Sequence, residues 1–267
     1  MQNNIVLIRG GGDLASGVAL RLHRAGIKTL ITELDQPLAV RRTVCFSEAV
    51  YAGQITIEGV TGRLVQIDQI NSSIDGNDIP VLVDPGIAIL KDLNFAIRVL
   101  IDGRMLKQAP EPLLRPVPLH IGLGPGFHAG ENCHAAIETR RSHTLGRVYW
   151  NGQTQPDSGQ PEGDPRRVLR APADGTIKNY VDIVTHVKQG ELIAEVDYKP
   201  ITSPLAGVIR GLIHDGLIVS KGMKVGDVDP RNDASVCYLV SDKALAIGGG
   251  VLEAILSKPE IREQLWN

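Results

Sequence analysis

The sequence predicts an α/β fold, in which a Rossmann-like module with a parallel sheet is followed by a smaller β domain. Three observations favour this class. Hydrophobic residues make up 43% of the 267 residues, yet only three are Phe and two are Trp, so the apolar content is mainly aliphatic, as in buried parallel strands. A glycine turn follows the first apolar run, and a pattern repeats once at an offset of 32 residues.

Charge and composition exclude several classes of protein. The chain has 28 basic and 30 acidic side chains and a formal net charge of −2, so no global charge favours nucleic acid or a membrane surface. We find no basic leader and no run of roughly 18 apolar residues, which predicts a cytoplasmic protein. The three cysteines form no CxxC pair, which favours reduced thiols over disulfides or a zinc knuckle.

The first module is expected to begin with a strand, a turn and a helix. Residues 4–8 are a short apolar run that leads into three consecutive glycines. A helix with apolar residues at helical spacing follows and ends at Gly26. Residues 28–32 form the second predicted strand, which ends at Glu33. We expect a further helix over residues 38–52.

The glycine turn is the first candidate site. Gly10-x-Gly12-x-x-Ala15 matches the looser dinucleotide-binding fingerprint, and an acid stands where a ribose is commonly bound. Glycines let a phosphate approach the backbone, and the helix N-terminus presents unpaired N–H groups to it. Asp13 could instead cap the helix and occupy these donors, or the glycines could only form a tight turn. The candidate cofactor-binding residues are Gly10, Gly11, Gly12, Asp13, Ser16, Gly17 and Glu33.

Two further apolar runs, at residues 80–84 and 96–102, end in acidic turns and extend the predicted sheet. Asp84 would lie at the carboxyl edge of that sheet, beside the glycine turn. It is therefore another candidate for ligand contact, or else a residue that only shapes its turn. Arg41 and Arg42, in the helix expected over residues 38–52, could clamp an anion or lie on a solvated face.

A proline-dense connector leads into a second segment that is rich in glycine and histidine. Its main-chain amides could form an anion-binding concavity, with basic side chains nearby. The candidates in this segment are Gly122, Gly124, Gly126, Arg140 and His143. Glu138 could handle a proton there, or could pair with an arginine. Four histidines fall within 24 residues, but their spacing matches no zinc signature, so no metal site is predicted.

The β domain is predicted from the internal repeat. Residues 171–177 align with residues 203–209, and the register holds over 27 positions without a gap. The pattern resembles biotinyl and lipoyl carrier domains, which implies a barrel-sandwich β domain. In those domains the hairpin between the halves carries a modified lysine, whereas here Tyr198 takes that place and Lys199 precedes a proline. No biotin or lipoate is therefore expected, and we interpret the domain as structural or docking.

Four regions are therefore expected along the chain. They are a nucleotide-binding module over residues 1–112, a connecting segment over 113–165, a lipoyl-like β domain over 166–232, and a strand and helix over 233–267 that pack back on the first module.

Four motifs are long enough to be specific. They are RGGGDLASG at residues 9–17, IGLGPGF at 121–127 with AAIET at 135–139, KGMKVGDVDPR at 221–231, and SDKALAIGGG at 241–250. With them the chain resembles, over essentially its full length, the YqeB-type family of accessory proteins encoded with selenium-dependent molybdenum hydroxylases. The glycine turn is more distantly similar to XdhC-like proteins, which deliver matured molybdenum cofactor.

The resemblance implies an accessory protein in the maturation of a molybdenum hydroxylase, with that enzyme or its cofactor-maturation proteins as partners. The two glycine loops predict a nucleotide or molybdopterin-type phosphate ligand, and a homo-oligomer is left open. The alternatives are an NAD(P)-linked oxidoreductase with Glu33 as ribose acceptor, and a scaffold without a small ligand. No catalytic residue is predicted, and whether the chain is an enzyme stays open at this point.

Overall fold

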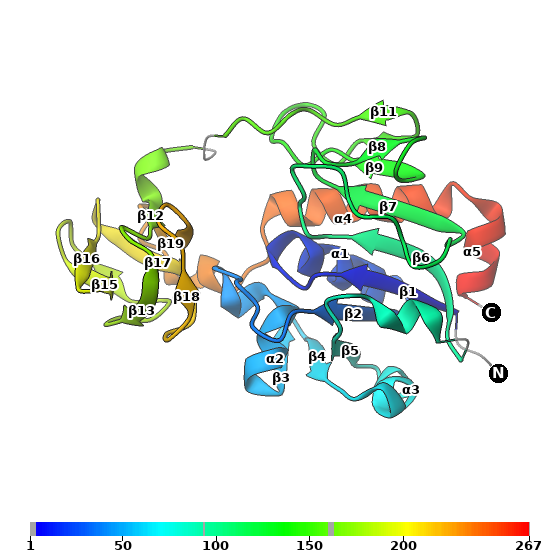
Figure 1. Ribbon diagram of the computed structural model, residues 1–267, viewed down its shortest axis with the longest axis horizontal. Helices are drawn as coiled ribbons and strands as arrows, with labels where there is room; N and C mark the ends of the chain where they lie inside the picture. Colours follow the sequence, from blue (N-terminus) through cyan, green and yellow to red (C-terminus); the bar gives the residue numbers. More distant parts are fainter. Residues whose placement is uncertain (1–3, 93, 160–162, 267) are drawn as a thin grey trace. The chain divides into compact units, whose positions relative to one another are not determined.

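The structure is a computed structural model that describes residues 4–92, 94–159 and 163–266 (Figure 1). It divides into two compact units, which we describe separately. Unit 1 comprises Met1–Pro37, Cys45–Asp157 and Val240–Asn267, and unit 2 comprises Leu38–Val44 and Ser158–Leu239. Every helix among the described residues falls short of the length and hydrophobicity that a membrane span requires. The cytoplasmic location stays a prediction.

Unit 1 is built on a nine-stranded sheet with the order β10-β9-β7-β6-β1-β2-β5-β4-β3. The strands are β1 (Asn4–Arg9), β2 (Thr29–Glu33), β3 (Gln54–Ile57), β4 (Val60–Leu64), β5 (Ile79–Val83), β6 (Ala96–Asp102), β7 (Leu119–Leu123), β9 (Ala135–Ile137) and β10 (Val148–Tyr149). Within this order, neighbouring strands from β9 through to β4 are parallel. The two edge strands are antiparallel to their neighbours, β10 to β9 and β3 to β4. A separate two-stranded sheet pairs β8 (His128–Ala129) with β11 (Gly152–Gln153).

Five α-helices occur among the described residues, all in unit 1: α1 (Asp13–Arg24), α2 (Ala49–Ala52), α3 (Ile70–Asp75), α4 (Asp242–Leu256) and α5 (Pro259–Leu265). Short 3-10 turns add η3 (Ile67–Gln69) and η4 (Ala88–Lys91). Helix α1 joins β1 to β2 and lies beside α4 (Figure 1). Glycines allow this approach, because a Cβ at Gly17 would come within 2.6 Å of the Ala244 Cβ.

The core of unit 1 follows from the two-residue period of its central strands. Ile5 and Leu7 of β1 and Leu100 of β6 point to one face, where they form a buried cluster that also includes Leu90 of η4. The intervening residues of β1 point to the opposite face. The strands are buried on both faces, so they lack the polar alternation of a half-exposed sheet.

The predicted fold class, a Rossmann-like parallel sheet with a barrel-sandwich domain, is wrong. The sheet of unit 1 is mixed, few helices cover it, and unit 2 consists of separate antiparallel sheets. The physical reason lies in the connections. The parallel strands β6 and β7 are joined by the proline-rich residues 103–118, which contain no helix, because proline lacks the N–H and the backbone freedom that a helix needs.

Unit 2 contains two four-stranded antiparallel sheets with the orders β12-β19-β17-β14 and β16-β15-β13-β18. The strands are β12 (Val168–Arg170), β13 (Gly175–Asn179), β14 (His186–Val187), β15 (Leu192–Val196), β16 (Lys199–Thr202), β17 (Gly207–Leu212), β18 (Ile218–Val219) and β19 (Lys224–Asp229). Strand β13 pairs with β18, and β14 with β17. Each sheet therefore takes strands from both copies of the sequence repeat, so neither copy can bury its apolar face alone.

The helix predicted over residues 38–52 does not form. Residues 38–44 belong to unit 2, where the Val40 carbonyl accepts a hydrogen bond from the Leu212 N–H (2.9 Å). Only η1 (Arg42–Val44), η2 (Phe46–Glu48) and the four-residue α2 lie in this stretch. This hydrogen bond to β17 is a long-range contact, and such contacts override the local helical pattern of the sequence.

Candidate functional site

The carboxyl ends of the parallel strands in unit 1 meet at one edge of the sheet. Strand β1 leads through α1 to β2 on one side, whereas β6, on the other side of β1, follows β5 in the chain. The chain order therefore reverses between β1 and β6, and open sheets commonly bind ligands outside such a switch point. Arg9 and Asp102 end these two strands as register partners, and the Gly103 N–H donates to the Arg9 carbonyl (2.9 Å).

The glycine turn lies at this edge. Gly10 has a φ of +91°, which favours glycine, and its N–H donates to the Thr32 carbonyl (2.8 Å). Gly12 is the N-cap of α1, has an extended backbone and supplies no side-chain cap. A Cβ at Gly12 would meet no atom within 4 Å. The first turn of α1 thus begins in open space at a residue that cannot cap it.

Ser16 fixes the shape of the turn from inside the fold. Its hydroxyl donates to the Gly11 carbonyl (2.9 Å) and accepts from the Phe46 N–H (2.8 Å). The Ser47 N–H donates to the same Gly11 carbonyl (3.0 Å). Ser16 is fully buried, so it shapes the turn, and Gly17 serves the contact between α1 and α4.

Two of the three acidic candidates, Glu33 and Asp84, bind main-chain amides. Glu33 accepts from the Gly11 N–H (2.6 Å) and from the Leu34 N–H (2.7 Å). Asp84 accepts from the N–H groups of Ala88 and Ile89, each at 2.9 Å. The structure therefore joins Glu33 to the glycine turn, whereas Asp84 holds the start of η4.

A charged cluster beside the glycine turn was missed by the sequence reasoning. The edge cluster, as we name it, consists of Arg9, Asp102, Arg104 and Glu111. Arg104 binds Asp102 (2.6 Å) and Glu111 (2.9 Å), and Arg9 binds Glu111 (2.6 Å). A Cβ at Gly10 would lie 3.7 Å from Arg104. In the sequence, the acidic turn at Asp102 is a weak indication of a charged site. No spacing in the proline-rich connector distinguishes Glu111 from other exposed acids.

The edge cluster predicts a small, pH-dependent effect of Glu111→Gln. Hydrogen bonding from Arg104 lowers the pKa of Glu111 from 4.5 to about 2. The ionised carboxylate therefore stabilises the fold above pH 4.5, and this contribution is lost as the pH falls toward about 2. Because the side chain is 53% exposed, we expect a loss of at most about 1 kcal/mol at neutral pH.

Urea unfolding of wild type and Glu111→Gln at neutral pH and near pH 2 measures this difference. The two proteins should converge at the lower pH. A difference that is equal at both pH values would contradict the ion-pair explanation.

His120 and His134 also lie close together near this edge. The His134 ring nitrogen Nδ1 accepts from the His120 N–H (2.8 Å). Burial lowers the pKa of His120 to about 4, and its ring packs edge-on against Phe127 at 5.9 Å between centroids. Among the described residues, no group of three or more His, Cys, Asp or Glu side chains could hold a metal ion.

The second glycine loop is closely packed. A Cβ at Gly122 would collide with the Phe127 ring, and one at Gly126 would collide with the Gln108 carbonyl. The Gly126 N–H donates to the Leu106 carbonyl (2.8 Å). Packing therefore accounts for these two glycines, and the anion role assigned to Gly122, Gly124 and Gly126 stays a prediction. Burial raises the pKa of the adjacent Cys133 thiol to about 11, which favours the protonated thiol at neutral pH.

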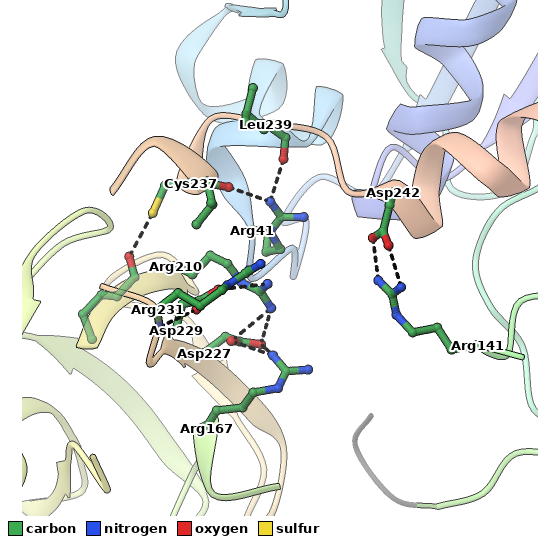
Figure 2. Close-up of polar contacts among 12 residues, drawn as sticks. Arg41, Arg141, Arg167, Arg210, Asp227, Asp229, Arg231, Cys237, Leu239 and Asp242 are labelled. Atoms are coloured by element: carbon green, nitrogen blue, oxygen red, sulfur yellow. Dashed lines mark hydrogen bonds and ion pairs between the residues drawn. The ribbon is translucent and has the colours of Figure 1, made fainter. Parts of the chain in front are cut away.

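Glu138 orders the loop that carries Arg140 and His143. It is fully buried and accepts from the N–H groups of Thr139, Arg140 and Gln155 at 2.8–2.9 Å. Both basic candidates are exposed. Their neighbour Arg141 forms a two-fold ion pair with Asp242, at the start of α4 (Figure 2).

A second charged cluster lies within unit 2 (Figure 2). The buried Asp227 carboxylate binds Arg167 (2.6 Å), Arg210 (3.1 Å) and Lys224 (3.2 Å). Hydrogen bonding from Arg231 lowers the pKa of Asp229 to about 2. Sequence spacing did not reveal this cluster, because its members come from η5 (Pro165–Arg167), β17 and β19.

Arg41 and Arg42 both bind main-chain carbonyls of unit 2. Arg41 donates to the carbonyls of Val236 (3.2 Å) and Leu239 (2.8 Å), the second of which Figure 2 shows. Arg42 donates to the Leu212 carbonyl (2.7 Å). These contacts anchor residues 38–44 within unit 2.

No model of a known protein family matches the sequence. YqeB from Escherichia coli strain K12 is 44% identical over 259 residues, which make up 95% of this chain and 48% of YqeB. This chain is a homologue of YqeB. The similarity supports a YqeB-type family. The chain spans about half the length of YqeB, which is described as uncharacterized, so this relative assigns no activity to the homologue.

Some solved structures are weakly similar to this chain, and they come from proteins with other names than YqeB. The product-bound ectoine utilization protein EutE of Ruegeria pomeroyi is 22% identical, with a TM-score of 0.23 over 30% of this chain and 27% of EutE. An aspartoacylase family protein of Mesorhizobium loti is 11% identical, with a TM-score of 0.28 over 85% of each chain. A succinylglutamate desuccinylase/aspartoacylase of Rhodobacter sphaeroides is 13% identical, with a TM-score of 0.25 over 85% of each chain. TM-scores this low assign neither a fold nor an activity to the YqeB homologue.

The predicted role in maturing a molybdenum hydroxylase is not borne out. The solved structures with partial likeness carry the names of aspartoacylase or desuccinylase proteins, and YqeB is described as uncharacterized. Four glycine-containing motifs carried the expectation, and in the structure several of their glycines serve packing between neighbouring segments.

Proposed function

We propose that unit 1 of this YqeB homologue binds a small phosphate-bearing ligand, such as a nucleotide, at the Gly10–Asp13 turn. The observation that carries the proposal is the start of α1. Gly12 is the N-cap residue of this helix, supplies no side-chain hydrogen bond to it, and has open space where a Cβ would lie. The turn also lies where the chain order reverses between β1 and β6.

The chemistry of the turn suits a phosphate. The first N–H groups of a helix lack intrahelical partners, and the helix dipole places partial positive charge there. A glycine at the N-cap lets the bulky phosphate reach these donors. The Gly11 N–H already holds an anionic oxygen, that of Glu33 at 2.6 Å, which supports the view that the turn accommodates oxyanions.

Gly12→Asp tests the proposal by separating folding from binding. An aspartate at this extended N-cap position should cap α1, raising the free energy of unfolding by about 0.5 kcal/mol. Its carboxylate would occupy the donors and repel a phosphate. We expect the affinity for ADP and inorganic pyrophosphate, measured by isothermal titration calorimetry, to fall at least about tenfold.

Gly249→Asp is the matched control. Gly249 lies exposed on α4 of the same unit, and a Cβ there meets no atom within 4 Å. This variant should bind both probes within about twofold of wild type. Absence of binding by wild type, or equal losses in both variants, would contradict the proposal. The predicted protein partner and homo-oligomer stay predictions.

A further inference from the structure

We infer that Glu33 is a built-in competitor for the ligand anion, and that the turn selects a diphosphate group over singly charged anions. The inference rests on the proposed function, since it concerns the same turn. It differs from the sequence-based expectation, in which this acid binds a ribose.

The geometry commits both carboxylate oxygens of Glu33. One oxygen accepts from the Gly11 N–H at 2.6 Å, and the other accepts from the Leu34 N–H at 2.7 Å. Hydrogen bonds this short to a charged acceptor are strong ones. The carboxylate therefore connects the end of β2 to the glycine turn. In this contact Glu33 occupies the place at the Gly11 N–H where a ligand anion would bind.

The peptide groups on both sides of the one that carries the Gly11 N–H are held in place. The Gly10 N–H, before it, donates to the Thr32 carbonyl (2.8 Å), and the Gly11 carbonyl, after it, accepts from the Ser16 hydroxyl (2.9 Å) and from the Ser47 N–H (3.0 Å). A Cβ at Gly11 would lie 2.8 Å from the Ser47 nitrogen, so this part of the backbone is closely packed. The Gly11 N–H thus has a fixed direction, and Glu33 takes a donor that a phosphate oxygen would otherwise use.

This occupancy determines which anions can bind. An incoming anion must displace Glu33 from Gly11, because an anion that binds the neighbouring amides beside it is repelled by its negative charge. Once Glu33 is displaced, a singly charged carboxylate gains nothing over the internal one, whereas a diphosphate offers more acceptor oxygens to the donors of the turn. A ribose acceptor would strengthen nucleotide binding, so the two roles predict effects of opposite sign on ADP affinity.

Glu33→Gln tests the inference in the full chain. Glutamine keeps one acceptor oxygen but cannot accept from both N–H groups, and it removes the charge. We expect its affinity for inorganic pyrophosphate and for ADP to rise about tenfold in calorimetric titrations, with acetate as the singly charged probe. Without ligand, the Gly11 amide should exchange its hydrogen faster than in wild type.

Asp35→Asn is the matched control, because it removes one negative charge from an exposed side chain two positions away. It should change either affinity less than about threefold. A tenfold loss of ADP affinity in Glu33→Gln with unchanged pyrophosphate affinity would overturn the inference in favour of a ribose acceptor. Equal effects of both variants, or acetate affinity matching that of pyrophosphate, would also overturn it.

The two proposals fail in different ways. If wild type binds pyrophosphate and Glu33→Gln binds it equally well, the ligand site stands and the competitor role is overturned. If wild type, Glu33→Gln and Asp35→Asn all fail to bind, the proposed function fails and takes the inference with it. Binding by Glu33→Gln alone would mean that Glu33 blocks the turn in wild type, which supports the competitor role and contradicts the proposed function.

Discussion

Asp227→Asn is expected to lower the free energy of unfolding of unit 2 by about 3 kcal/mol. The Asp227 side chain is 1% exposed and binds two arginines whose side chains are only 21% and 18% exposed, together with Lys224. Asparagine keeps the shape but removes the negative charge, which leaves these cations close together in a region of limited solvent. Breaking a buried ion pair from one side costs far more than an exposed pair contributes.

Hydrogen exchange of β17 and β19 at increasing urea concentration measures this effect, because the two units need not unfold together. Asp164→Asn is the control. Asp164 pairs with Arg166 on the surface, and its replacement should leave the unfolding of β17 and β19 unchanged. Equal stability of Asp227→Asn and wild type would mean that the charged cluster adds nothing to the fold.

Gly17→Ala is expected to destabilise unit 1 by about 2 kcal/mol, although alanine is the better helix former. The added Cβ would lie 2.6 Å from the Ala244 Cβ and 2.8 Å from the Ala244 carbonyl oxygen. Backbone atoms cannot swing aside like a flexible side chain, so α1 and α4 must separate. A lower melting temperature in differential scanning calorimetry reports this strain.

Gly249→Ala should change the stability of unit 1 in the opposite direction. It lies on α4 in open space, so the substitution only removes the conformational freedom of glycine and should stabilise the helix by about 0.5–1 kcal/mol. If both alanine variants raise the melting temperature, close contact between α1 and α4 is not what Gly17 provides.

Local periodicity predicted part of unit 1 correctly. The strand, glycine turn, helix and second strand from Asn4 to Glu33 occur as β1, α1 and β2, because apolar spacing and Gly26 specify them over short distances. Residues 38–52 were assigned wrongly. Their structure depends on bonds from Arg41 and Arg42 to carbonyls of residues 212, 236 and 239, and no local pattern contains that information.

The glycines show a second limit of the sequence. Gly12 and Gly126 look alike in the sequence, yet a Cβ at Gly12 would meet open space and one at Gly126 would strike a carbonyl. A glycine that admits a ligand and one that admits a neighbouring backbone have the same sequence signature. The edge cluster was missed for a related reason, because Arg9 and Glu111 are adjacent only after β1 and β6 pair.

The central claim is that the Gly10–Asp13 turn binds a phosphate group, and amide chemical shifts of the ¹⁵N-labelled full chain during a pyrophosphate titration test it most directly. We predict saturable shifts that are largest at the amides of Gly11, Gly12, Asp13 and Leu14, with smaller changes at Leu34, whose N–H shares the Glu33 carboxylate. Saturable shifts centred on residues 122–130 or on unit 2, or no saturable shifts, would contradict the claim.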